Sequence, residues 1–163
     1  EVMKEHQGRG VFWVDSSVRF RNGNIGNILD AALRNDGAYA VQIGYSIFSC
    51  TPPEMFKFLP LVKDPKKTSQ YQATFVLLCN SKFVIDHILR WWVACALSRT
   101  CIFSFPSRFC KFHKDSWNHF ASCSRYDQSA LSIVLHNAFT YMASVNGPIK
   151  VSRGGSGGKI KNC

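Results

Sequence analysis

The chain has 163 residues, of which 46% are hydrophobic and 13% aromatic. These proportions exclude a disordered segment and are enough for one buried core, so we expect a single domain. The formal net charge of +10 favours contact with phosphate groups, whether in a nucleotide diphosphate, an anionic lipid or a nucleic acid. Because the basic residues are spread along the chain rather than gathered on one helix, direct nucleic-acid binding is not expected.

The first half of the chain predicts two strands, one helix and a further helical turn. The apolar run at residues 11–14 is typical of a buried strand. A polar turn then precedes an amphipathic helix over residues 25–34, which Gly37 is placed to end. Alternation over residues 38–48 predicts a second strand, and residues 54–59 predict one helical turn.

The second half predicts a strand and two longer helices. Residues 73–78 form another buried strand, and residues 81–98 form a core helix whose charged positions exclude a membrane span. A cysteine-rich loop, residues 100–123, leads to a last helix over residues 127–142. Together these elements indicate an α/β domain over residues 1–150, followed by a flexible, basic, glycine-rich tail over residues 151–163.

The cysteines are many for a cytosolic domain and odd in number. In an oxidising compartment up to three pairs would form. Cys95 is expected to be buried on the apolar face of its helix as an unpaired, small hydrophobic residue. The pairs Cys110-x-x-His113 and His119-x-x-x-Cys123 have ligand types that zinc accepts, but their separation is shorter than the about 12 residues of the common finger. In a secretory lumen, a disulfide using Cys101, Cys110 or Cys123 is favoured over zinc.

Asp15 is the first candidate site residue, because it follows an apolar strand in the sequence VFWVDSSVRF. One interpretation is structural: Asp15 and the serines after it cap the turn by bonding backbone amides. The other is that Asp15 holds Mn²⁺ or Mg²⁺ together with a diphosphate, with Ser17 as a weaker ligand. Arg19 and Arg21 would add positive charge beside that diphosphate.

Asp127 and Gln128, in SRYDQSAL, are the second candidate pair. Asp127 is either the N-cap of the last helix or a general base for an acceptor hydroxyl, with Gln128 as its hydrogen-bonding partner. Among the tryptophans, Trp117 stands in polar sequence and is the best candidate to stack on a sugar ring. No nucleophile-elbow, zinc-protease, P-loop or dinucleotide-binding motif occurs.

Four segments carry a resemblance to a known family: FWVDSSVRF, TPPEMFKFLP, RWWVACALSRTCI and CSRYDQSALSIVL. They resemble a family of animal proteins, common in nematodes, that are similar to nucleotide-sugar glycosyltransferases of the GT-A type. That family has an Asp-x-Ser or Asp-x-Asp motif after a strand. It also has a Cys-Ala-Leu-x-x-x-Cys-Ile pattern after a helix and a His/Arg-x-Asp-Gln-Ser-Ala-Leu motif that opens a late helix.

The resemblance implies a GT-A-like mixed sheet flanked by helices, lacking its N-terminal nucleotide-binding part. It implies metal-assisted transfer of a sugar from a nucleotide diphosphate donor to a glycan or other hydroxyl acceptor. Asp15 and Ser17 would take the metal–diphosphate position, and Asp127 and Gln128 the late acidic position. It further implies residence in the Golgi or secretory lumen, with membrane attachment only through an anchor outside these residues.

Two alternatives belong to other classes of protein. In the first, the chain is a catalytically silent binding module or truncated pseudoenzyme that keeps the fold. In the second, it is a basic adaptor for phosphate-rich surfaces, whose binding would collapse between low and moderate salt. Hydrolysis of a nucleotide sugar without acceptor separates the enzyme from the silent module.

Overall fold

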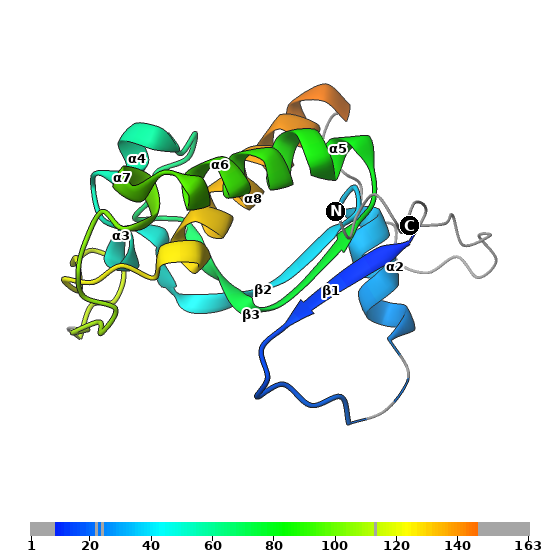
Figure 1. The fold of residues 1–163 in the computed structure, drawn as a ribbon, viewed down its shortest axis with the longest axis horizontal. Coiled ribbons are helices and arrows are strands. Elements are labelled where there is room, and N and C mark those ends of the chain that lie inside the picture. The colour runs from blue at the N-terminus through cyan, green and yellow to red at the C-terminus, as the bar shows by residue number, and fades with distance from the viewer. Residues whose placement is uncertain (1–8, 22, 24, 113, 147–163) are drawn as a thin grey trace.

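The computed structural model describes residues 9–21, 23, 25–112 and 114–146. Its centre is a three-stranded sheet with the order β1-β3-β2, in which both neighbouring pairs are antiparallel (Figure 1). The strands are β1 (Gly10–Val14), β2 (Ala38–Ser46) and β3 (Ser69–Cys79). The predicted mixed α/β class is therefore confirmed, as are the three predicted strands. Two details are wrong: β1 is an edge strand rather than a buried one, with Trp13 60% exposed, and the sheet of the described residues is antiparallel rather than mixed.

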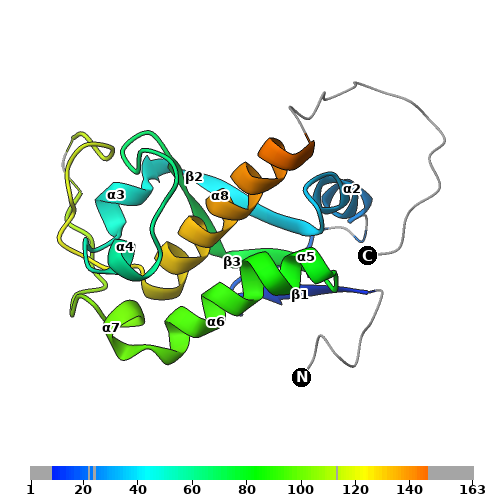
Figure 2. The same cartoon turned by 90° about the horizontal axis from the view of Figure 1, so that it is seen from above.

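Helices cover both faces of this sheet. Helix α2 (Gly26–Arg34) packs on one face, and α6 (Arg90–Leu97) and α8 (Tyr126–Asn146) lie on the other (Figures 1 and 2). Because side chains alternate along a strand, β3 supplies both layers. Val76 and Leu78 join the core beneath α8, while Leu77 packs against α2.

Helix α2 ends as the sequence predicts. Gly37 has a φ of +95°, and its N–H donates to Ala32 O at 2.8 Å. A Cβ built on Gly37 would lie 2.9 Å from Cys79 Cβ, so both the backbone angle and the close packing require glycine here.

The second strand ends at Ser46, before the predicted residue 48, because a short helix begins at Ile47. Ser46 caps α3 (Ile47–Cys50) by accepting a hydrogen bond from Ser49 N. The predicted helical turn after it is confirmed as α4 (Met55–Phe58).

The helix predicted over residues 81–98 is interrupted. It consists of α5 (Lys82–Val84), a π-helical segment (Ile85–Leu89) and α6, and α7 (Arg99–Ile102) follows directly. Its interpretation as a core helix is wrong for the α6 part. Trp91 and Val93 are each 51% exposed and Leu97 is 84% exposed. One apolar side of α6 is therefore open to solvent.

Helix α8 is the core helix of the molecule, with every residue from 130 to 135 buried. It begins at Tyr126, whose N–H donates to Ser124 Oγ at 3.2 Å. The structural interpretation of Asp127 as the N-cap is therefore wrong, because Asp127 lies inside the first turn.

Among the described residues, disulfides join Cys95 to Cys101 and Cys110 to Cys123, which is consistent with an oxidising secretory environment. Cys95 is buried as predicted but is not unpaired. The chain turns at Ser98, which accepts a hydrogen bond from Cys101 N and so brings Cys101 back to Cys95. Within the described ranges, no helix combines the length and hydrophobicity that a membrane crossing needs. The predicted boundary at residue 150 and the tail lie outside the described residues.

Candidate functional site

Asp15 stands immediately after β1, an edge strand of the sheet. Its N–H donates to Thr74 O at 2.8 Å, so the backbone at this position is tied to β3. Its C=O accepts from Val18 N at 2.9 Å and closes a tight turn. The carboxylate itself is exposed and accepts a hydrogen bond from Ser16 Oγ at 3.4 Å. Main-chain groups therefore close the turn, and the carboxylate faces solvent.

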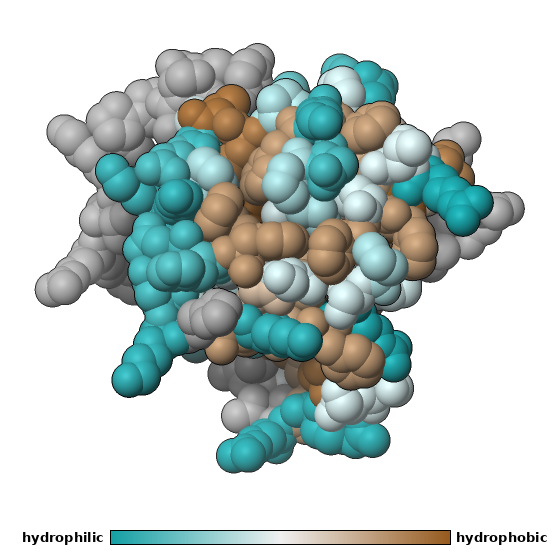
Figure 3. All heavy atoms as spheres, turned by 90° about the vertical axis from the view of Figure 1, so that its left-hand side faces the viewer, coloured by the Kyte–Doolittle hydropathy of each residue, from teal (hydrophilic) through white to brown (hydrophobic). Residues whose placement is uncertain are grey.

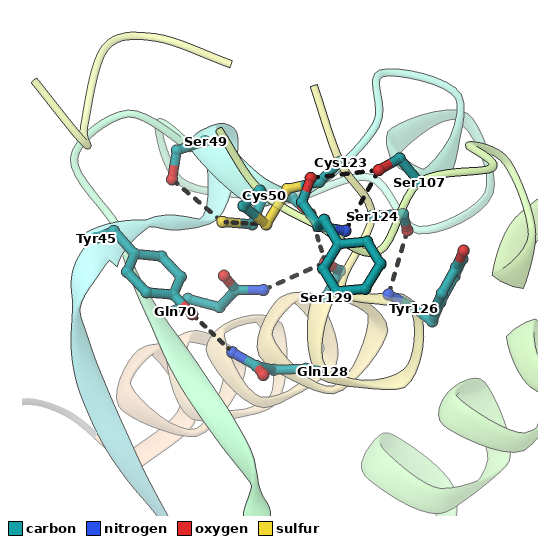
Figure 4. Close-up of a disulfide and its surroundings, with 12 residues drawn as sticks. Tyr45, Ser49, Cys50, Gln70, Ser107, Cys123, Ser124, Tyr126, Gln128 and Ser129 are labelled. Atoms are coloured by element: carbon teal, nitrogen blue, oxygen red, sulfur yellow. Dashed lines mark hydrogen bonds between the residues drawn. A yellow bond between two sulfur atoms is a disulfide. The ribbon is translucent and has the colours of Figure 1, made fainter. Parts of the chain in front are cut away.

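Asp127 and Gln128 are positioned by contacts from two other elements. The Asp127 carbonyl oxygen accepts a hydrogen bond from Trp92 Nε1 at 3.1 Å, which joins the first turn of α8 to α6. Gln128 Nε2 donates to the hydroxyl of Tyr45 on β2 at 3.4 Å (Figure 4). Burial raises the pKa of Tyr45, and the hydrogen bond from Gln128 partly opposes that shift. The Asp127 side chain is exposed.

One hollow brings these two candidate sites together. It has a volume of about 410 Å³, and Asp15 and Asp127 both line it. Its lining consists of Trp13, Val14, Asp15, Ser16, Ala73, Thr74, Asp127 and Gln128. Segments from opposite ends of the chain thus meet over the middle of β3.

A second hollow, of about 470 Å³, lies on the other side of Asp127 and Gln128, which line both. It adds two arginines, Arg108 and Arg125, and the sulfur-bearing residue Cys110. Arg125 Nε is buried and has no hydrogen-bond partner among the described residues. Sequence reasoning missed both arginines as site residues; the only signal was the place of Arg125, two residues ahead of Asp127.

The other predicted site residues lie elsewhere. Arg19 donates from its guanidinium to Ser16 O and Val18 O, so it folds back on its own turn. Ser17 and Arg21 are exposed, and neither is among the lining residues of the two hollows. Trp117 lies in the cysteine-rich loop, with its C=O accepting from Ser46 Oγ at 2.7 Å, and it lines neither hollow.

The donor atoms of the first hollow fit a hard divalent cation. Mg²⁺ and Mn²⁺ prefer carboxylate and other oxygen ligands, and Mg²⁺ needs one or two protein carboxylates when phosphates complete its coordination. Asp15 and Asp127 supply carboxylates, and Ser16 and Thr74 supply hydroxyls.

The zinc alternative does not fit. Cys110 and Cys123, two of its four expected ligands, are bonded to each other, and His113 lies outside the described residues. A disulfide sulfur lacks the thiolate charge with which cysteine binds zinc.

An apolar hollow of about 530 Å³ lies at the end of the molecule that carries α3 and α4. Its lining consists of Phe48, Thr51, Pro53, Phe56, Pro60, Leu61, Pro65 and Phe120. Figure 3 looks onto this end and shows apolar side chains across the middle of the face, with hydrophilic ones around them. This lining contains no titratable side chain, unlike the linings of the two hollows that share Asp127 and Gln128.

Comparison with known proteins adds no family: no protein-family model matches the chain, and neither a curated protein nor a solved structure matches it significantly.

Proposed function

We propose that the chain is a metal-assisted glycosyltransferase, or part of one, that moves a sugar from a nucleotide diphosphate donor to a hydroxyl acceptor. One observation carries the proposal: Asp15 and the pair Asp127 and Gln128, which the resemblance assigns to the metal and to the late acidic motif, line the same hollow. The turn after β1 and the start of α8 are far apart in the sequence, and the packing of α8 on β3 brings them to the same hollow.

The division of roles follows from chemistry. Asp15 contributes a carboxylate to Mn²⁺ or Mg²⁺, and the serine beside it that reaches the hollow is Ser16 rather than Ser17. The cation offsets the charge that develops on the departing diphosphate. Asp127 takes the proton of the acceptor hydroxyl or holds that hydroxyl, and Gln128 fixes the orientation of the acceptor by hydrogen bonding.

The arginines that suit the diphosphate are Arg108 and Arg125, because the hollow that they line adjoins Asp127. Guanidinium groups pair with phosphate oxygens in a bidentate manner and stay charged at all physiological pH values. They take the part that the sequence assigned to Arg19 and Arg21. Residence in the Golgi belongs to the same proposal and is supported by the two disulfides.

Calorimetric titration with UDP and GDP, with and without Mn²⁺, tests the donor site. We expect metal-dependent binding that Asp15→Ala abolishes. Asp30→Ala is the matched control, since Asp30 is an exposed carboxylate on α2, outside both hollows. Equal binding by the wild type and Asp15→Ala, or no binding at all, would contradict the proposal.

Hydrolysis of the nucleotide sugar without acceptor then separates an enzyme from a silent binding module. An enzyme releases free sugar slowly, and Asp127→Asn lowers that rate while leaving metal-dependent UDP binding intact. Binding without any hydrolysis would assign the chain to the silent class.

A further inference from the structure

Three sulfur atoms meet where the cysteine-rich loop joins α8. Cys110 and Cys123 form a disulfide, and Cys50, the last residue of α3, is a buried free thiol. The distance from Cys50 Sγ to Cys110 Sγ is 3.8 Å, and the three sulfurs lie within 4.8 Å of one another (Figure 4). A free thiol in van der Waals contact with a disulfide has the proximity that sulfur exchange requires.

Polar groups surround the Cys50 sulfur in spite of its burial. Ser49 Oγ lies 3.6 Å from Cys50 Sγ. Burial raises the pKa of the Cys50 thiol, whereas the Ser49 hydroxyl and the Arg125 guanidinium lower it. The Ser49 hydroxyl donates to Ser46 O at 2.8 Å, so it must turn to donate to the thiolate, while the Arg125 guanidinium supplies positive charge.

We propose that Cys50, Cys110 and Cys123 form an intramolecular thiol–disulfide exchange site. The Cys50 thiolate bonds to Cys110 Sγ, the Cys110–Cys123 bond breaks, and its electron pair leaves on Cys123 Sγ, which takes up the proton. One thiol and one disulfide are present before and after, so the step needs no external oxidant or reductant.

The compact arrangement of the sulfurs sets one condition for this step. Thiolates attack along the axis of the S–S bond, while these three sulfurs form a triangle rather than a line. The Cys50 side chain must therefore rotate about its Cα–Cβ bond before the new bond forms.

The exchange changes which residue is disulfide-bonded to Cys110, close to the proposed active site. In one isomer the loop is bonded to Cys123, four residues before Asp127; in the other it is bonded to the end of α3. The backbone responds because Cys50 O accepts hydrogen bonds from Ser129 Oγ at 2.9 Å and from Arg125 N at 3.2 Å. The exchange involves only these three cysteines and does not depend on sugar transfer.

Trapping the wild-type chain tests the exchange directly. The folded protein is incubated at pH 8 with iodoacetamide, then digested, and the labelled cysteines and disulfides are mapped by mass spectrometry. We expect a fraction that carries the label on Cys123 and a Cys50–Cys110 disulfide, and this fraction should form faster as the pH rises, because the thiolate attacks. Label confined to Cys50 at every time and pH would overturn the proposal.

Two variants keep the test decisive. In Cys123→Ser, oxidation with glutathione disulfide should produce a Cys50–Cys110 bond. The matched control is Cys101→Ser, which frees Cys95. In the part of the chain that the structure describes, no third sulfur joins the Cys95–Cys101 pair, so Cys95 should carry glutathione instead. If Cys123→Ser does not fold, Cys110→Ser should pair Cys50 with Cys123. Glutathione adducts on both Cys50 and its expected partner in whichever variant folds would contradict the inference.

Discussion

Ser129 joins three elements, so its replacement gives a sharp test of how the site is held. Its Oγ donates to Cys50 O at 2.9 Å and accepts from Gln70 Nε2 at 3.2 Å, and all three residues are buried (Figure 4). Ser129→Ala removes both hydrogen bonds. Cys50 O keeps a partner in Arg125 N, whereas the Gln70 amide is left without an acceptor in the core.

The expected loss follows from those two bonds. The bond to Cys50 O contributes about 1 kcal/mol, and stranding the buried Gln70 N–H costs about 1–3 kcal/mol, so Ser129→Ala should destabilise the protein by about 2–4 kcal/mol. Gln70 Oε1 already has no partner among the described residues. Gln70→Met therefore removes an amide that is only half satisfied, and in that background Ser129→Ala should cost only about 1 kcal/mol.

Urea unfolding followed by tryptophan fluorescence measures both values through the linear dependence of the unfolding free energy on denaturant. The slope should be unchanged, because neither substitution alters the surface exposed on unfolding. Equal losses in the two backgrounds would show that the Ser129–Gln70 contact contributes nothing, and a loss below about 0.5 kcal/mol in the wild type would refute the reasoning altogether.

Two further predictions concern the core and the end of α2. Burial lowers the pKa of His136, whose Nε2 lies 2.8 Å from Ser69 O, so the unfolded chain binds more protons than the folded one just below about pH 6.5. Stability should fall as the pH drops through that value, and His136→Gln should flatten the fall measured by urea unfolding at several pH values. Gly37→Ala should destabilise by more than about 1 kcal/mol because of its positive φ and its approach to Cys79, whereas Gly44→Ala, with open space around the added Cβ, should lower the melting temperature far less.

The sequence predicts those elements whose local pattern of apolar residues is enough to specify both their type and their buried face. The apolar run of β3 and the amphipathic repeat of α2 specify burial and period, and Gly37 marks a helix end by its chemistry. The π-helical segment inside the helix predicted over residues 81–98 could not be predicted, because it has an ordinary helical sequence.

The sequence singles out only some of the residues that line the two hollows, and it does not predict how they come together. Asp15 and Asp127 each stood out as a polar residue at an element end, yet their common hollow depends on how α8 crosses β3, which no local pattern records. Arg108 was missed for the same reason, since it reaches the site only through the course of the 103–125 loop. Cysteine pairing likewise depends on the folded path, because seven cysteines allow many combinations.

Strand β3 explains why the backbone at Asp15 and the first turns of α8 keep a fixed relation. Asp15 is bonded through its backbone to Thr74 O, and Thr74 itself lines the hollow. On the facing helix, Ser132 Oγ accepts from Tyr71 N at 2.9 Å and donates to Gln128 O at 2.7 Å, so the first turns of α8 are bonded to the same strand. The segments that carry both acidic positions are therefore hydrogen-bonded to residues 71–74 of β3. The proposed transfer needs the cation and the diphosphate to be placed before the acceptor arrives, and the anchoring of both segments on one strand favours that order.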